Sequence, residues 1–196
     1  MHPAAPFRIA VSASFTAEPL EAFFRFWSRR LSAGFEPVFA PYNQILQTLL
    51  DPGSVFAANH AGVNVILARA ADLAASPTSG PERREQLAAH ARELASEERR
   101  AAARFAVPLL FVLCPSPDEE EFQAAEMILR DALAGAAEMH FIDHAEILRL
   151  YPVAQIHDAH AARIARIPYT EEMYAALATM IIRRAHTLAM PPYKVI

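Results

Sequence analysis

The chain has 196 residues and a formal net charge of −4 at pH 7; 54% of its residues are hydrophobic and 20% are charged. This balance excludes a disordered chain and gives no electrostatic reason to expect a nucleic acid or an anionic membrane as partner. One cysteine excludes an intrachain disulfide and a thiolate zinc cluster and fits a cytoplasmic protein, while five scattered glycines leave no place for a glycine-rich phosphate loop.

Short apolar runs alternate with helical patterns from the first residues onward. The run Arg8–Ala13 has strand length and is followed by a helix whose apolar residues, from Leu20 to Leu31, recur on one face and predict a buried stripe that includes Trp27. A second strand is predicted over Glu36–Ala40. A short helix and a third strand follow, over residues Tyr42–Leu50 and Val63–Ala68.

The second half of the chain continues this alternation. The predicted elements are a long helix from Pro81, a strand over Val107–Cys114, a helix ending near Ala134, a strand over Met139–Ile142, a helix over His144–Tyr151 and a last helix after Thr170. Such alternation predicts a three-layer α/β sandwich with a mainly parallel sheet of about five strands. Because ligands bind beyond the carboxyl ends of parallel strands, we expect the chemistry at Ser12–Thr16, Arg69–Asp72, Cys114–Asp118 and Asp143–His144.

Three segments resemble the FkbH-like family of polyketide and nonribosomal-peptide assembly lines. They are Ile9–Trp27, Phe39–Arg69 and Ile167–Ile196, in the order that the family has them. The resemblance implies an SGNH-hydrolase-like domain over residues 1–190, of flavodoxin-like architecture, and the start of a truncated haloacid-dehalogenase-like phosphatase domain over residues 191–196. The Asp-x-Asp-x-Thr motif of that second domain does not occur here, so we expect no phosphoryl chemistry from this chain.

The SGNH resemblance also implies a nucleophile. In SGNH hydrolases a serine follows the first strand and lies at a helix N-terminus, where free amides stabilise an oxyanion. Ser14 and Ser12 occupy this place, although Ser12-Ala13-Ser14 replaces the usual Gly-Asp-Ser. The alternative is that Ser14 and Thr16 only satisfy backbone amides of a turn and a helix cap.

A serine nucleophile needs a general base. SGNH enzymes take it from an Asp-x-x-His near the last helix, and Asp158-Ala159-His160 is one residue too short for this motif. Relatives carry a histidine directly before Ile-Pro-Tyr-Thr, where this chain has Arg166, which cannot accept a proton at neutral pH. The base would then be His160 or His157, oriented by Asp158. Both histidines also fit a solvated short helix.

The predicted substrate-binding residues are Thr16, Asn59, Asn64 and Arg166. The amides of Asn59 and Asn64 are candidates for the oxyanion donor of an SGNH site, or for structural hydrogen bonds to a loop. We predict no metal and no cofactor, because the cluster of His140, Asp143 and His144 does not supply the four ligands of structural zinc.

Two functions follow from this reading. The first is an accessory domain of a modular synthase that positions a carrier-bound acyl group of glyceryl type without catalysing a reaction alone. The second is an SGNH-type serine hydrolase or acyltransferase acting on that group. The partners would be an acyl or peptidyl carrier protein and neighbouring synthase domains. Both functions require the end of the first strand to meet the start of the last helix at one edge of the sheet.

Overall fold

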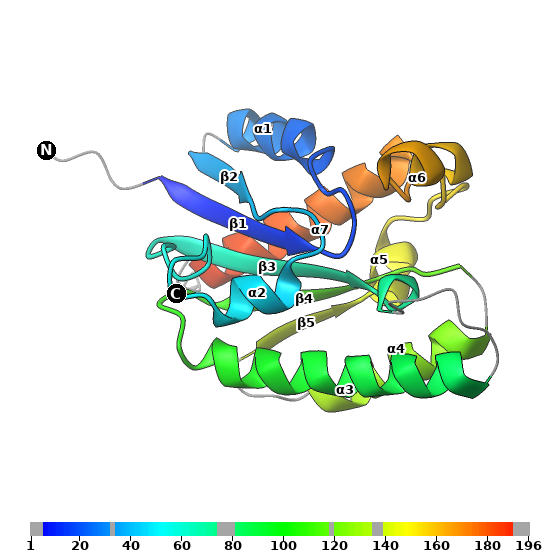
Figure 1. The fold of residues 1–196 in the computed structure, drawn as a ribbon. Helices are drawn as coiled ribbons and strands as arrows, with labels where there is room; N and C mark the ends of the chain where they lie inside the picture. Colours follow the sequence, from blue (N-terminus) through cyan, green and yellow to red (C-terminus); the bar gives the residue numbers. More distant parts are fainter. Residues whose placement is uncertain (1–5, 32–33, 74–80, 118–119, 135–138, 190–196) are drawn as a thin grey trace, which may run out of the picture.

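The computed structural model describes residues 6–31, 34–73, 81–117, 120–134 and 139–189. Its centre is a five-stranded sheet in which all neighbouring strands are parallel, in the order β2-β1-β3-β4-β5 (Figure 1). The strands are β1 (Phe7–Ala13), β2 (Phe35–Phe39), β3 (Gly62–Arg69), β4 (Leu109–Cys114) and β5 (Met139–Asp143). This confirms the predicted fold class; residues 191–196, where a second domain is predicted to begin, lie outside the described residues.

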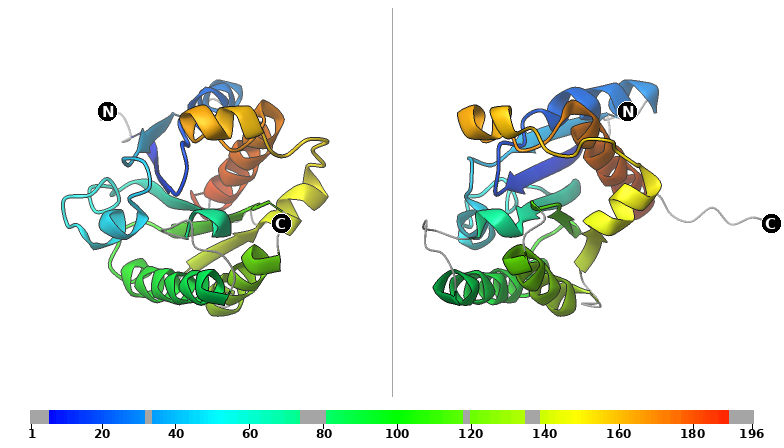
Figure 2. Two further views of the ribbon diagram at one scale, coloured as in Figure 1. Left: turned by 45° about the vertical axis from the view of Figure 1, so that its right-hand side comes forward. Right: turned by 90° about the vertical axis from the view of Figure 1, so that its right-hand side faces the viewer.

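Helices cover both faces of the sheet (Figures 1 and 2). One face carries α1 (Leu20–Arg30), α5 (His144–Leu150), α6 (Ala159–Ala165) and α7 (Glu171–Ala189), and the other carries α2 (Ile45–Leu50), α3 (Pro81–Ala102) and α4 (Glu120–Leu133). Within the described ranges, no helix has both the length and the apolar character that a bilayer crossing requires.

The side chains of β1 alternate between the two cores. Ile9 and Val11 pack toward α1 and α7, whereas Ala10 and Ser12 face α2 and α3. In contrast, β4 is buried at every position, because helices cover both sides of a central parallel strand. This burial explains why its sequence is a continuous apolar run.

The first residue of β3 has a conformation and a contact that only glycine permits. Gly62 has a φ of 145°, and a Cβ atom built on it would lie 1.8 Å from the carbonyl oxygen of Arg8. Arg8 is also its partner in the ladder between β1 and β3. The glycine therefore lets the amino ends of the two central strands approach each other.

The end of β1 meets the segment before α7, as predicted. The backbone N–H of Thr16 donates to the carbonyl of Arg166 at 2.9 Å, and its hydroxyl donates to the carbonyl of Ala165 at 2.8 Å. From α7, the Tyr174 hydroxyl donates to the carbonyl of Thr16 at 2.8 Å. The prediction that Thr16 caps the following helix is wrong, because α1 begins after Pro19 and has no side-chain cap.

One carboxyl group is buried in the core without compensation. Glu98 on α3 is 0% exposed, and neither of its oxygens has a hydrogen-bond partner among the residues described. Burial raises the pKa of Glu98 well above the ordinary value, because the charged form loses its water. The folded protein then holds a proton that the unfolded chain releases, so stability falls as the pH rises from about 4.3 through the raised pKa.

We predict that Glu98→Met raises the free energy of unfolding at pH 8 by at least about 1 kcal/mol, because an apolar side chain of similar length needs no hydrogen bonds. The gain should shrink toward pH 5. Urea unfolding followed by circular dichroism measures both effects. Glu85→Met, at an exposed position of the same helix, is the control and should change stability by less than about 0.5 kcal/mol. A Glu98→Met protein no more stable than wild type at pH 8 would contradict this account.

Candidate functional site

Three polar side chains meet at the carboxyl edge of the sheet, where β1 and β3 end. The Ser14 hydroxyl donates to Oδ2 of Asp72 at 2.8 Å and accepts the backbone N–H of Arg69 at 3.1 Å. The Arg69 guanidinium donates to both oxygens of Asp72, at 2.9 and 2.5 Å. Ser14 is 2% exposed, so its hydrogen-bonding capacity is directed into the protein.

The strand register and one aromatic ring hold this cluster in place. The N–H of Ser14 donates to the carbonyl of Leu67, which continues the ladder between β1 and β3 to the edge of the sheet. Arg69 Cζ lies 6.0 Å from the ring centroid of buried Tyr169, whose hydroxyl donates to the carbonyl of Pro115. Tyr169 therefore connects the ends of β3 and β4.

The Ser14 cluster borders a cavity of about 490 Å³, which we call the Ser14 cavity. It is lined by the end of β1, the loop and helix around α2, the short 3₁₀ helix Ala70–Asp72 and α3. His90 and Glu93 face it from α3. Nδ1 of His90 is 2.6 Å from the carbonyl oxygen of Leu73; because a carbonyl only accepts, Nδ1 donates, and in a neutral ring Nε2 is then the acceptor.

Arg166, the residue that ends α6, lines the same cavity. It ends α6 in the left-handed conformation, with φ 56° and ψ 32°, and its carbonyl holds the Thr16 amide. Its side chain is exposed and lines the cavity together with Ser14. The position at which the resemblance implies a histidine thus lies beside the candidate serine. In this chain that position holds an arginine, whose side chain is positively charged.

The predicted base and its orienting residue do not line the Ser14 cavity. The carboxylate of Asp158 caps α6 by accepting the backbone N–H groups of His160 and Ala161, at 3.0 and 2.9 Å. His160 is exposed on that helix. Oδ1 of Asp158 is therefore used by backbone amides, and in the described part of the chain no hydrogen bond joins Asp158 to a histidine ring.

His157, one residue before Asp158, lies against the buried Tyr169. Its ring centroid is 5.6 Å from that of Tyr169, and an isolated antiparallel bridge joins the two residues. Burial and the positive charge of Arg69 lower the pKa of His157, while hydrogen bonds with the backbone of Ser116 and Pro168 oppose that shift. His157 is therefore uncharged at neutral pH.

The structure also separates Ser12, Asn59 and Asn64 from Ser14. Ser12 is fully buried and donates to the hydroxyl of Thr48 on α2 at 3.2 Å. Asn59 donates to the side chain of Asn64 at 3.0 Å, and Asn64 donates to the carbonyl of Phe56. Asn64 is the third residue of β3 and pairs with Leu109, the first residue of β4, so this amide pair lies toward the amino ends of these strands. Its hydrogen bonds are the structural ones that the sequence left as an alternative.

Sequence reasoning did not single out Arg69, Asp72 or His90. The segment Arg69–Asp72 was expected at the functional edge, but a single sequence does not show which of its side chains turns toward Ser14. His90 lies in the middle of a long helix with a polar outer face, where nothing in the pattern separates it from solvated neighbours.

No model of a protein family matches the chain, and no curated protein matches it in sequence. Solved structures are similar in fold. The N-terminal part of protein BF1531 from Bacteroides fragilis, containing a phosphatase domain and complexed with Mg, gives a TM-score of 0.70 at 14% identity over 91% of this chain and 51% of that one. BT4096, a gut microbial diltiazem-metabolizing enzyme, gives 0.62 at 11% identity over 95% and 48%.

A carbohydrate esterase family 2 enzyme with a carbohydrate-binding domain, from Corynascus thermopiles (Myceliophthora fergusii), gives a TM-score of 0.50 at 11% identity over 93% of this chain and 68% of that one. The chain thus spans about half the length of the BF1531 and BT4096 chains. At these identities the likeness shows the fold alone, a parallel five-stranded sheet with helices on both faces.

We predict that Asp72→Asn lowers the free energy of unfolding by about 2 kcal/mol, because the Arg69 side chain, only 16% exposed, loses its charged partner. Ser14→Ala should cost less, about 1 kcal/mol, since it removes one neutral hydroxyl. Urea unfolding at neutral pH measures both. Asp131→Asn, at an exposed position on α4, should stay within about 0.5 kcal/mol of wild type. Equal midpoints for Asp72→Asn and Asp131→Asn would show that the cluster does not stabilise the fold.

Proposed function

We propose that this chain is the N-terminal domain of an FkbH-like protein of a polyketide or nonribosomal-peptide assembly line. In this proposal it holds a carrier-bound, hydroxylated acyl group of glyceryl type in the Ser14 cavity and does not hydrolyse it. The observation that carries the proposal is the direction of the Ser14 hydroxyl. It donates to a carboxylate already paired with Arg69, and Arg166 lies where a base would face it.

The side chains around the Ser14 cavity fit such a group. Its lining includes the hydroxyl of Tyr42 and the amides of Asn43 and Gln47, which can hydrogen-bond to hydroxyl groups of a ligand. Arg166 is exposed at this cavity and is not neutralised by a carboxylate in the described part of the chain. A guanidinium in this place would pair with a carboxylate or with the phosphate of a carrier arm.

The fold comparison supports placing the domain in a larger protein. This chain covers 51% of the BF1531 chain, which is described as containing a phosphatase domain. A second domain with phosphatase-like architecture is also what the resemblance of residues 191–196 implies. The carrier protein and the neighbouring synthase domains would then be the partners of this chain.

One observation favours a second function, serine-dependent acyl hydrolysis or transfer. His90 lines the same cavity as Ser14, and its Nε2 is the free acceptor of a ring oriented through Nδ1. In such a reaction Ser14 Oγ would attack the acyl carbonyl carbon and pass its proton to His90 Nε2. The thioester C–S bond would then break, and His90 would return the proton to the departing carrier thiol, leaving the acyl group as an ester on Ser14. For this the Ser14 hydroxyl would have to leave Asp72, which is why we rank this function second.

The test measures turnover and binding on the same protein. We expect no turnover of p-nitrophenyl acetate or of a glyceryl-carrier thioester above that of Ser14→Ala. We also expect saturable, salt-sensitive binding of the glyceryl-carrier protein, weakened about tenfold by Arg166→Asn through loss of one charge-assisted contact. Asparagine tolerates the left-handed backbone of residue 166, so the charge is removed without new strain.

Arg163→Asn is the matched control, because Arg163 is exposed on α6 and does not line the cavity. It should bind the carrier like wild type. Turnover by wild type that is lost in both Ser14→Ala and His90→Ala would contradict the binding-domain proposal and support the hydrolase instead. Absence of both turnover and carrier binding at high micromolar concentration would refute both functions.

A further inference from the structure

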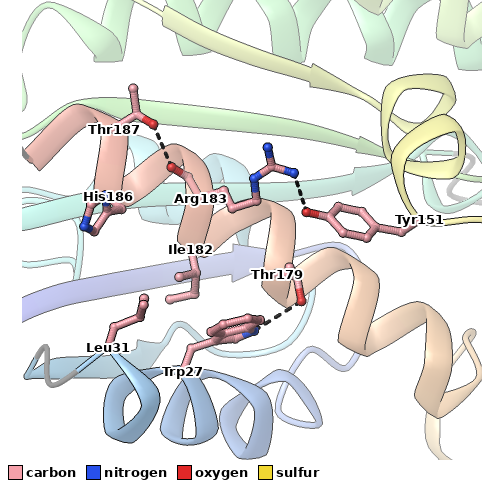
Figure 3. A pocket seen from close by; sticks show the side chains of 8 residues that line it. All are labelled: Trp27, Leu31, Tyr151, Thr179, Ile182, Arg183, His186 and Thr187. Carbon is pink, nitrogen blue, oxygen red and sulfur yellow. Dashed lines mark hydrogen bonds between the residues drawn. The ribbon is translucent and has the colours of Figure 1, made fainter. Parts of the chain in front are cut away.

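A second cavity, of about 690 Å³, lies between α1 and α7 (Figure 3). Trp27 and Leu31 line it from the end of α1, and Thr179, Ile182, Arg183, His186 and Thr187 line it from α7. Tyr151, which follows α5, closes one side. We call it the Trp27 cavity. None of its residues lines the Ser14 cavity.

One side of the Trp27 cavity is apolar. The indole N–H of Trp27 donates to the hydroxyl of Thr179 at 3.2 Å, so the only polar atom of the ring is satisfied and its faces remain for apolar contacts. Ile182 lies beside it in Figure 3. Leu31, predicted to be buried on the α1 stripe, is 43% exposed. Ile182 is itself 2% exposed, so the apolar surface left uncovered at the end of α1 belongs mainly to Leu31 and the half-buried Trp27.

The other side carries a cation that the protein holds but does not neutralise. Arg183 donates to the Tyr151 hydroxyl at 2.7 Å, and its guanidinium carbon is 5.9 Å from the centroid of that ring. No carboxylate of the described residues forms a salt bridge with Arg183, whereas the next residue, Arg184, pairs with Glu146 at 2.8 Å. Two contacts with Tyr151 thus fix the guanidinium and leave most of its N–H groups free.

We infer that the Trp27 cavity binds an amphiphilic anion: an acyl chain of medium length that ends in a carboxylate or a phosphate. The chain would lie against Trp27, Leu31 and Ile182, and the anionic head would pair with Arg183, with His186 as a further donor. The volume is in the range of small-molecule sites, and an apolar lining with one placed charge is the composition that such sites have. This inference does not rest on the proposed function, because the two cavities share no residue.

The only tryptophan of the chain lines this cavity, so intrinsic fluorescence reports its occupancy directly. We propose titrating the full chain with decanoate and with decyl phosphate below their micelle-forming concentrations. We expect a saturable change in Trp27 emission with both. Acetate, which lacks the chain, should give no change, and decan-1-ol, which lacks the charge, should bind about tenfold more weakly.

Two variants test the contacts at positions that are exposed. Arg183→Gln should weaken decanoate about tenfold and leave decan-1-ol unchanged, because only the anionic head contacts the guanidinium. Leu31→Glu should abolish decanoate binding by placing a like charge beside the chain. Arg184→Gln is the matched control: it lies on the same helix, does not line the cavity and should bind decanoate like wild type. Circular dichroism confirms that each variant is folded.

Several results would overturn the inference. They are no saturable change with decanoate, equal affinity of wild type and Arg183→Gln for decanoate, or a fluorescence response to anionic phosphatidylglycerol vesicles alone, which would indicate a membrane-contact surface instead. Ser14→Ala and Arg166→Asn should bind decanoate like wild type. A negative carrier-binding experiment would therefore not affect the decanoate titration, and a negative decanoate titration would not affect the carrier-binding experiment.

Discussion

Thr16 forms two hydrogen bonds with the end of α6, and the candidate site depends on them. Its amide and hydroxyl donate to the carbonyls of Arg166 and Ala165, and Tyr174 from α7 donates to its own carbonyl. These contacts join the loop after the first strand to a segment about 150 residues later in the sequence. Ser14 lies two residues before Thr16, and Arg166 is one of its hydrogen-bond partners. These hydrogen bonds therefore bring Ser14 and Arg166 to the same cavity.

The Ser14 cluster differs from a catalytic triad in what its carboxylate contacts. A catalytic carboxylate orients a histidine, which in turn accepts the serine proton. Here the carboxylate of Asp72 contacts the hydroxyl directly, and both of its oxygens are already held by Arg69. A carboxylate neutralised in this way gains little from the serine proton, and Arg166 cannot take it either. In the structure the Ser14 hydroxyl is thus held between Asp72 and the Arg69 amide beside the Ser14 cavity.

The sequence predicted the strands well because each central strand is a continuous apolar run between turns. It also placed Ser14 and Arg69–Asp72 at one edge, because parallel strands present their carboxyl ends together. It could not assign partners across that edge. Asp158 precedes a short helix, and the same residue type serves as a helix cap or as the orienting member of a catalytic set. Only coordinates show that its oxygen is used by two backbone amides.

Asn64 shows the same limit for the ladder. A polar residue in an apolar strand predicts a buried hydrogen bond, but the edge at which it lies depends on the register, which pairs it with Ala10. The stripe ending at Trp27 and Leu31 is a related case. Helical spacing predicts which residues share a face of α1, but not that α7 fails to cover the end of that face.

Both cavities depend on α7, at different points along it. Tyr174 near its start holds Thr16 at the Ser14 edge, while Arg183, nine residues further, lines the Trp27 cavity; at the rise of an α-helix these positions are about 14 Å apart. In a parallel α/β sheet the helices run back against the strands, so a helix that begins at the carboxyl edge ends at the amino edge. The packing of α7 thus supports both the Ser14 cavity and the Trp27 cavity. A change in the buried stripe of this helix would alter both cavities. Exposed residues such as Arg166 and Arg183 change one site without the other, which makes the two sites separable by experiment.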